Sequence, residues 1–188
     1  LVYRREMGHD FEVNFKYPVI LKASDSVDYF AHDFENLHKI FKLNSREEID
    51  KTIDEIYEAG YSGTLIIQDM IPGNDEYMRV LTSYSGKDGK VKMMCLGHVL
   101  LEEHTPLGLG NHALIMTEPN EELMLKAKKL LEELHFVGFS NFDIKYDSRD
   151  GKFKFFELNV RQGRSNFYVT NSGFNIAKYL VEDYIEDK

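Results

Sequence analysis

Short apolar runs and one amphipathic segment alternate along the first third of the chain. The run 19–21 opens after Pro18 and ends at Lys22, and its β-branched composition predicts a buried strand. A weaker run over 39–43 and a stronger one over 64–68 predict two further strands. This part of the chain therefore reads as strands with one helix between them.

The amphipathic segment begins at a recognisable helix start. Ser45 is followed three residues later by Glu48, which is the pattern of a capping box, and Gly60 supplies the stop. We expect a helix between them with one apolar face. The residues that form this face at helical spacing are Ile49, Ile53, Ile56 and Tyr57.

The rest of the chain carries more strand patterns, separated by turn-forming residues. Residues 71–74 break the chain, 86–89 read as a hairpin turn, and 106–111 read as a loop. The mixed order of strands and helices predicts an α+β fold. The strands expected in this part are 77–85, 90–101, 112–117, 139–148 and 152–160.

Two more helices complete the pattern. Asn120 caps the first of them, and the second closes the chain. The side chains that the first is expected to turn inward are Leu123, Ala127, Leu130, Leu131 and Leu134. Those that the second is expected to turn inward are Ile176, Leu180, Val181, Tyr184 and Ile185.

Composition narrows the classes of function. The 188 residues include 32 Asp plus Glu against 23 Lys plus Arg, a net charge of −9, which argues against broad nucleic-acid binding. No apolar run approaches the roughly 20 residues that cross a bilayer, so no membrane insertion is expected. Cys95 is the only cysteine, which excludes an internal disulfide and favours the cytoplasm. Because the chain begins at Leu1 rather than Met, we expect that a preceding part is missing, with a processed N-terminus as the alternative.

The strongest chemical signal lies in the last predicted hairpin. A three-residue turn at 149–151, with glycine in the left-handed position, pairs Ser148 with Lys152. Counting back along both strands then pairs Asp143 with Glu157, and directly paired residues point to the same face. A two-residue turn would place the two acids on opposite faces, so the prediction depends on the length of the turn.

Asn159 shares the face of Glu157, two residues along the strand. Two carboxylates that face each other across a ladder repel unless a cation lies between them. Oxygen ligands suit magnesium or manganese, and an incomplete protein shell leaves room for phosphate oxygens, as in a nucleotide-metal site. The alternative is the solvated polar face of an amphipathic hairpin.

Four motifs, in their order along the chain, resemble the ATP-grasp ligases. They are Lys22 at the end of an early strand, the segment 68–75 (QDMIPGND), Asp143, and the segment 157–161 (ELNVR). The resemblance covers most of the chain. It implies two small α+β lobes with antiparallel sheets, 1–70 and 71–188, which enclose ATP in a cleft, and a further domain that precedes them.

The resemblance implies a role for each motif near the nucleotide. Lys22 would contact the ATP phosphates, and Asp75 would accept hydrogen bonds from the ribose hydroxyls. A surface lysine at a strand exit and an acidic residue in an ordinary turn are the competing accounts. The linker residues that would line the adenine are Gln68, Asp69, Met70 and Ile71.

The resemblance also implies a pair of metal ions, Mg²⁺ or Mn²⁺. Asp143 and Glu157 would bind one ion, and Glu157 with Asn159 a second that bridges phosphate oxygens. Arg161 would stabilise the charged acyl-phosphate through its fixed fork of donors. Further candidate anion contacts, with surface ion pairs as the alternative, are Arg79 and Arg164.

The chemistry implied is ATP-dependent ligation, in which a carboxylate attacks the γ-phosphate and an amine then displaces phosphate from the acyl-phosphate. Segments 22–29, 97–106 and 159–168 look like the branch that contains D-aspartate ligases, which add an amino acid to a peptidoglycan precursor. Two departures stand out: 23–36 lacks the glycine-rich phosphate loop of many relatives, and Val160 stands where relatives often have proline.

Other functions compete with the ligase. A catalytically inactive ATP-binding or sensing module, or an ATP-binding domain like that of carbamoyl-phosphate synthase, would use the same motifs. A purely structural α+β domain would make the carboxylate register accidental. The intact set of Asp143, Glu157, Asn159 and Arg161 favours an enzyme acting on small-molecule carboxylate and amine substrates. The pattern does not indicate an oligomeric state.

Overall fold

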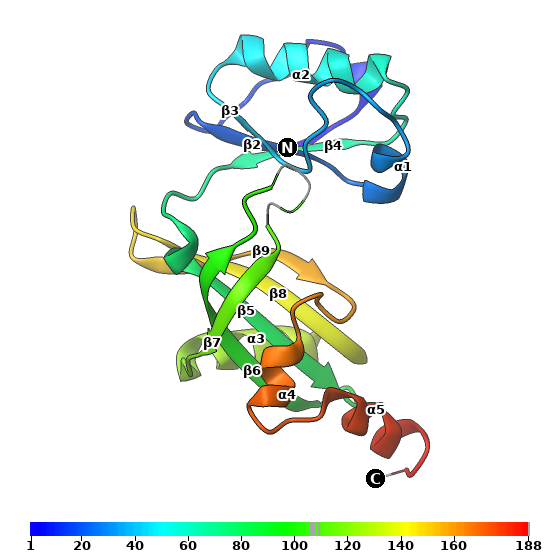
Figure 1. Cartoon of the computed structure of the whole chain (residues 1–188), viewed down its shortest axis with the longest axis vertical. Helices are drawn as coiled ribbons and strands as arrows, with labels where there is room; N and C mark the ends of the chain where they lie inside the picture. The colour runs from blue at the N-terminus through cyan, green and yellow to red at the C-terminus, as the bar shows by residue number, and fades with distance from the viewer. Residues whose placement is uncertain (106–107, 109, 188) are drawn as a thin grey trace. The chain divides into compact units, whose positions relative to one another are not determined.

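The computed structural model describes every residue except 106, 107, 109 and 188. The chain divides into two compact units, one built on Leu1–Met70 and the other on Ile71–Glu103 together with Gly110–Lys188. Figure 1 shows the elements of both units. Each unit has its own sheet and its own buried core, so each satisfies its own hydrophobic burial.

The first unit is a four-stranded antiparallel sheet with the strand order β1-β4-β2-β3, covered by a helix. The strands are β1 (Val2–Tyr3), β2 (Val19–Ala23), β3 (Phe41–Leu43) and β4 (Leu65–Asp69). The helices are a 3-10 turn (Arg5–Met7), α1 (Ser26–Phe30) and α2 (Arg46–Glu58). The strands and the long helix that the sequence predicts are confirmed, whereas α1 falls in a segment without hydrophobic period and was not predicted.

Helix α2 begins as its sequence predicts, with one difference in the cap. The Ser45 hydroxyl accepts a hydrogen bond from the Glu48 backbone amide at 3.2 Å. The Glu48 carboxylate, however, accepts the backbone amide of Asn44 at 2.7 Å, one residue before the position that a capping box requires. Both interactions satisfy backbone donors at the helix start, so the helix still begins at Arg46.

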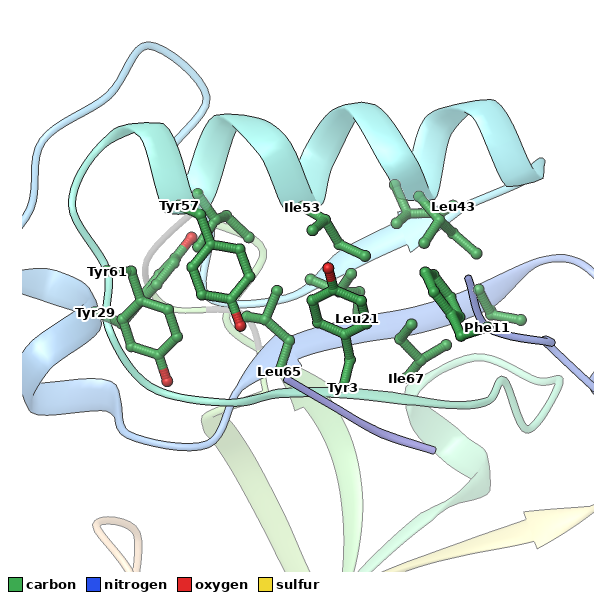
Figure 2. Close-up of a cluster of buried hydrophobic side chains, with 13 residues drawn as sticks. Tyr3, Phe11, Leu21, Tyr29, Leu43, Ile53, Tyr57, Tyr61, Leu65 and Ile67 are labelled. Atoms are coloured by element: carbon green, nitrogen blue, oxygen red, sulfur yellow. The ribbon is translucent and has the colours of Figure 1, made fainter. Parts of the chain in front are cut away.

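The core of the first unit lies between α2 and the sheet (Figure 2). Ile53 of α2 is 1% exposed and packs with Leu21, Leu65 and Ile67 from the two central strands. Tyrosines fill the ends of this layer, and their hydroxyls donate hydrogen bonds to backbone carbonyls. The Tyr57 hydroxyl, for example, donates to the Gly63 carbonyl at 2.9 Å. Burial raises the pKa of this tyrosine to about 12, which keeps it a neutral donor.

The second unit is a five-stranded antiparallel sheet with the strand order β7-β6-β5-β8-β9. The strands are β5 (Met78–Ser85), β6 (Val91–Glu102), β7 (His112–Thr117), β8 (Gly138–Asp147) and β9 (Lys152–Asn159). The helices are a 3-10 turn (Asp75–Tyr77), α3 (Glu121–Glu133), α4 (Phe167–Asn171) and α5 (Ile176–Tyr184). These strands and the two longer helices confirm the sequence pattern; the predicted loop 106–111 lies in part outside the described residues.

The two faces of this sheet bury different helices. Alternate residues of β5 divide between them: Leu81 packs with α3, and Val80 packs with Val169 of α4 and Ile176 of α5. Both faces of the central strand are therefore buried. No helix within the described part of the chain has the length and apolar character needed to cross a membrane.

The inward faces predicted for the last two helices are partly wrong. Leu130 of α3 and Leu134 at its C-cap are 41% and 60% exposed, although the other three predicted positions are buried. In α5 only Ile176 of the predicted set is buried. The exposed residues of that set are Leu180, Val181, Tyr184 and Ile185.

A polar contact explains the orientation of α5. The Asp183 carboxylate accepts the Tyr84 hydroxyl at 2.7 Å and the Lys87 backbone amide at 3.0 Å. With Ile176 buried and Tyr179 packed on the same core, the inner face runs 176, 179 and 183. Hydrophobic spacing alone could not reveal it, because its last member is charged.

We expect that Ile53→Ala lowers the free energy of unfolding by about 3 kcal/mol, since it removes a fully buried side chain and leaves a cavity between α2 and the sheet. Denaturant titration followed by circular dichroism measures this change. Lys51→Ala is the control, because Lys51 lies on the same helix with a side chain that is 76% exposed. Equal effects of the two substitutions would contradict the assigned core.

Candidate active site

The turn between β8 and β9 is built around Asp147. Its carboxylate accepts the Arg149 backbone amide at 3.0 Å and the Arg149 guanidinium at 2.8 and 2.9 Å. Strand pairing starts with Asp147 opposite Lys152, so the loop has four residues, 148–151. The predicted three-residue turn with Ser148 opposite Lys152 is therefore wrong, because the aspartate side chain and carbonyl fold the chain one residue earlier.

A bulge in β9 restores the register farther along. Ile144 lies opposite Phe155, and the next pair is Asp143 with Glu157, so Phe156 is the extra residue of a β-bulge. The early turn and the bulge each shift the strands by one residue, in opposite senses. The pairing of Asp143 with Glu157 is thus the predicted one, although the route to it differs.

Asp143, Glu157 and Asn159 form the centre of the candidate site. All three are half-buried, and Asn159 lies opposite Asn141, one pair beyond Phe142 and Leu158. The Asn159 amide donates to Asp143 Oδ2 at 3.3 Å. Two acids and an amide oxygen thus share one face of the sheet within side-chain reach of each other.

Arg161 joins this group from the loop after β9. Its Nη2 donates to Asn159 Oδ1 at 3.2 Å, and its Nη1 donates to the Gln162 carbonyl at 2.9 Å. A permanent positive charge therefore stands beside the amide that contacts Asp143. An anionic group placed near the two acids would meet this guanidinium as well.

The donor set fits a divalent cation held jointly with a ligand. Carboxylate and amide oxygens are ligands that magnesium prefers, and the two facing acids supply the negative charge. No group of three or more His, Cys, Asp or Glu side chains able to hold a metal ion is found in the described residues. The protein residues at this face would therefore make an incomplete shell, which water and phosphate oxygens complete.

Arg79 is not brought to this face. It pairs with Ile144, whereas the next residue, Val80, pairs with Asp143, so Arg79 projects from the opposite face of the sheet. There its guanidinium lies 3.2 Å from Glu118 Oε2 and donates to two backbone carbonyls, with the side chain 11% exposed. Arg79 therefore forms an ion pair, which is the alternative given for it above.

Arg164 lies in the loop after β9, and its side chain is 72% exposed. Its guanidinium is 3.7 Å from the Glu103 carboxylate. This is a loose surface ion pair, which leaves the guanidinium accessible from solvent.

In the first unit, Lys22 and Gln68 lie on one face of the sheet. Lys22 pairs with Ile66 and Gln68 pairs with Ile20, while the alternate residues of both strands are buried beneath α2. Both side chains are half-buried and point away from that helix. Asp69 pairs with Val19 and so points to the side of α2.

The predicted adenine linker spans the boundary between the two units. Met70 closes the first unit and Ile71 opens the second, and both are half-buried. Asp75 follows in a 3-10 turn of the second unit. Its Oδ2 accepts the Glu102 backbone amide at 2.9 Å, which ties this turn to the end of β6.

Sequence reasoning missed Lys145 as a member of this region. Its ammonium donates to the Gly73 carbonyl at 2.8 Å and so fixes the turn that precedes Asp75. The signal was available in the sequence: Lys145 stands two residues after Asp143 on a regular strand and therefore shares its face.

Known proteins of similar sequence and structure include ligases. A D-aspartate ligase of Enterococcus faecium (strain Aus0004) is 48% identical over 192 residues, which cover 100% of this chain and 46% of that protein. The chain thus spans about half the length of this curated relative. No family model matches the chain.

Two solved structures resemble the chain in fold. The biotin carboxylase domain of Hydrogenobacter thermophilus 2-oxoglutarate carboxylase, in complex with MgADP, ADP and bicarbonate, has a TM-score of 0.62 at 16% identity and covers 89% of this chain and 36% of its own. An L-amino acid ligase from Bacillus licheniformis has a TM-score of 0.61 at 15% identity and covers 96% and 41%.

These similarities confirm the predicted resemblance and the α+β fold class. The chain has the ATP-grasp fold and is related by sequence to a D-aspartate ligase over its whole length. At identities of 15% and 16%, the solved structures establish the fold alone.

We expect Asp147→Asn to destabilise the hairpin in a pH-dependent manner. The Arg149 guanidinium lowers the pKa of Asp147 to about 2, below its value in an unfolded chain. The charged carboxylate therefore stabilises the fold above about pH 4, and this contribution disappears as the pH falls towards 2. Unfolding titrations at pH 7, 4 and 2.5 should show the variant less stable at pH 7 and the difference shrinking with acid.

The matched control for this experiment is Asp10→Asn, an exposed aspartate of the first unit. It should leave the unfolding free energy almost unchanged at each pH. A constant difference between wild type and Asp147→Asn across the pH range would contradict the assigned ion pair.

Proposed function

We propose that this chain carries the ATP-binding and metal-binding parts of an ATP-dependent carboxylate-amine ligase that works through an acyl-phosphate. The observation that carries the proposal is the register of the last hairpin, where Asp143 faces Glu157 and Asn159 lies within reach on the same face. Carboxylate and amide oxygens in this arrangement are ligands that suit a divalent cation held jointly with phosphate oxygens. The sequence similarity to a D-aspartate ligase supports the same function.

In this proposal Asp143, Glu157 and Asn159 hold Mg²⁺, or Mn²⁺, against the phosphates of ATP. When bound, the metal ions, expected to be two, neutralise charge on the transferring γ-phosphoryl group. The protein side chains fix the position of that charge, because both strands that carry them are paired within a sheet. Catalysis then rests on positioning and electrostatics rather than on a protein nucleophile.

Arg161 is proposed to stabilise the anionic acyl-phosphate and its successor. Its guanidinium is permanently charged and is already held at the Asn159 amide. Arg79 is left out of the proposed site, because it projects from the other face of the sheet.

Three sets of residues are proposed to contact the nucleotide. Lys22, on the face of the first sheet that points away from α2, is proposed to contact the phosphates. The Asp75 carboxylate is proposed to accept hydrogen bonds from the ribose hydroxyls. The linker residues proposed to contact adenine are Gln68, Asp69, Met70 and Ile71.

For the substrates we propose D-aspartate as the carboxylate and an amine of a peptidoglycan precursor as the acceptor. The similarity to a D-aspartate ligase that is 48% identical supports the first of these. Because ATP is consumed, we place the reaction in the cytoplasm. An ATP-binding module without ligase activity is the function that the experiment below must exclude.

Trapping the intermediate tests the proposal without knowledge of the acceptor. The full gene product that contains this chain is incubated with ATP, Mg²⁺, hydroxylamine and one of D-aspartate, L-aspartate or no carboxylate. Hydroxylamine is an amine nucleophile that converts an acyl-phosphate to a stable hydroxamate. Of the three reactions, we expect only the one that contains D-aspartate to form hydroxamate and phosphate. Calorimetric binding of MgATP without hydroxamate from any amino acid would instead support a binding module.

We expect Glu157→Gln to lower metal-dependent turnover by more than about 100-fold, since it removes a charged ligand that both ions would share. Without metal, the variant should have nearly the same free energy of unfolding as the wild type, because glutamine keeps the size of the half-buried side chain. Glu133→Gln, at the exposed end of α3, is the control. Activity of Glu157→Gln equal to that of the control would remove the proposed metal role.

A further inference from the structure

A buried polar cluster lies on the same face of the second sheet as the two acids. Its members are Thr82 of β5, Asn141 of β8, Asn166 before α4 and Tyr168 within α4, and none is more than 9% exposed. Thr82 pairs with Asn141, and Val80, two residues earlier, pairs with Asp143. The cluster therefore sits one alternate position along the strands from the acids.

The Thr82 hydroxyl is the hub of this cluster. It lies 3.1 Å from Asn141 Oδ1, 3.0 Å from Asn166 Oδ1 and 3.0 Å from the Tyr168 hydroxyl. The tyrosine hydroxyl also donates to the Cys95 carbonyl at 2.8 Å. Burial raises the pKa of Tyr168 far above its ordinary value, so it remains a neutral donor.

The cluster lies beneath the loop 160–166 that carries Arg161. This loop leaves the end of β9 at one edge of the sheet and reaches β7 at the other, where the Ser165 hydroxyl donates to the His112 carbonyl at 2.8 Å. In its middle, a Cβ added at Gly163 would lie 2.7 Å from Asn141 Oδ1 and 2.8 Å from Asn166 Oδ1. The loop backbone thus lies close to the two amides, and a side chain in place of Gly163 would force the amide oxygens or the loop to shift.

Apolar residues would close this core at lower cost. The Asn166 Nδ2 is buried and has no hydrogen-bond partner among the described residues, and an unsatisfied buried amide costs free energy. Asn166 also occupies the N-cap of α4 but makes no capping hydrogen bond, because its side chain turns to Thr82 instead. A polar arrangement that costs stability indicates a requirement for specific geometry.

We propose that Thr82, Asn141 and Asn166 are positioning residues that fix the loop 160–166 and so hold Arg161 and Asn159 beside Asp143. This inference rests on the proposed function for its catalytic consequence. Asn141 contributes twice, since it lies beneath Gly163 and pairs with Asn159 across the ladder. All three side chains are buried, so each is proposed to act through the loop or through Asn159.

The first test measures the loop itself. Thr82→Val removes the hydroxyl but keeps the shape of the side chain, and hydrogen exchange followed by mass spectrometry reports on the amides of 160–166. We expect faster exchange in that loop and unchanged exchange in the first unit. Thr82→Ser, which keeps the hydroxyl, should restore the wild-type rate. The control is Ser83→Ala. Ser83 is equally buried on the same strand, but its side chain lies on the other face of the sheet, where its hydroxyl contacts that of Ser140.

The second test measures the chemistry with the hydroxamate assay. We expect Thr82→Val to lower kcat by about tenfold with little change in the KM for ATP. The reason is that Arg161, which is proposed to act on the transition state, would lose its fixed position. In the Arg161→Ala background the same substitution should cost less than about twofold, because residues that act through one another are not additive. A merely structural role would give equal effects in both backgrounds.

The outcomes separate the two proposals. A wild-type protein that forms no hydroxamate rejects the proposed function, while the exchange experiment still decides whether Thr82 fixes the loop. An active enzyme in which Thr82→Val changes neither exchange nor kcat overturns the inference. If Thr82→Val does not fold, Asn166→Ala removes the same contact from the loop side and is held to the same expectations.

Discussion

The pairing of β8 with β9, which places Asp143 opposite Glu157, is the constraint on which the proposed site depends. Strand pairing places the two carboxylates opposite each other, half-buried, on one face of the sheet. Together with the Asn159 amide, these carboxylates make a set of oxygen ligands suited to a divalent cation. On the opposite face, Phe142 and Ile144 of β8 pack in the core with side chains of α3.

The register of the hairpin shows how much of the site could be predicted and why the rest could not. Counting back from a predicted three-residue turn paired Asp143 with Glu157, and the structure has this pair although the turn is different. The length of the turn could not be predicted, because the Asp147 side chain binds the Arg149 backbone and the loop begins one residue early. The bulge at Phe156 compensates, and nothing local in the sequence distinguishes it from a regular strand residue. A correct pairing thus came from two unpredicted shifts that cancel.

Other expectations failed where a polar contact overrides hydrophobic spacing. The inner face of α5 is set by Asp183, which binds Tyr84 and the Lys87 backbone, so the apolar stripe of that helix points outward. The position of Arg79 was equally hidden, since an arginine in a strand has no signature of the face it takes until the register is known. In contrast, α2 was predictable because its cap and its apolar stripe agree.

Strand β8 connects these features, because its alternate residues serve three purposes on one face. Asn141 belongs to the buried cluster, Asp143 to the proposed metal site, and Lys145 binds the Gly73 carbonyl of the turn that opens the second unit. Successive positions on one face are about 7 Å apart. The pairing of β8 with β5 has no shift from Gly138 to Lys145, whereas the bulge falls on β9. The bulge therefore changes the course of β9 and leaves β8 regular. The spacing between Asn141, Asp143 and Lys145 is that of a regular strand.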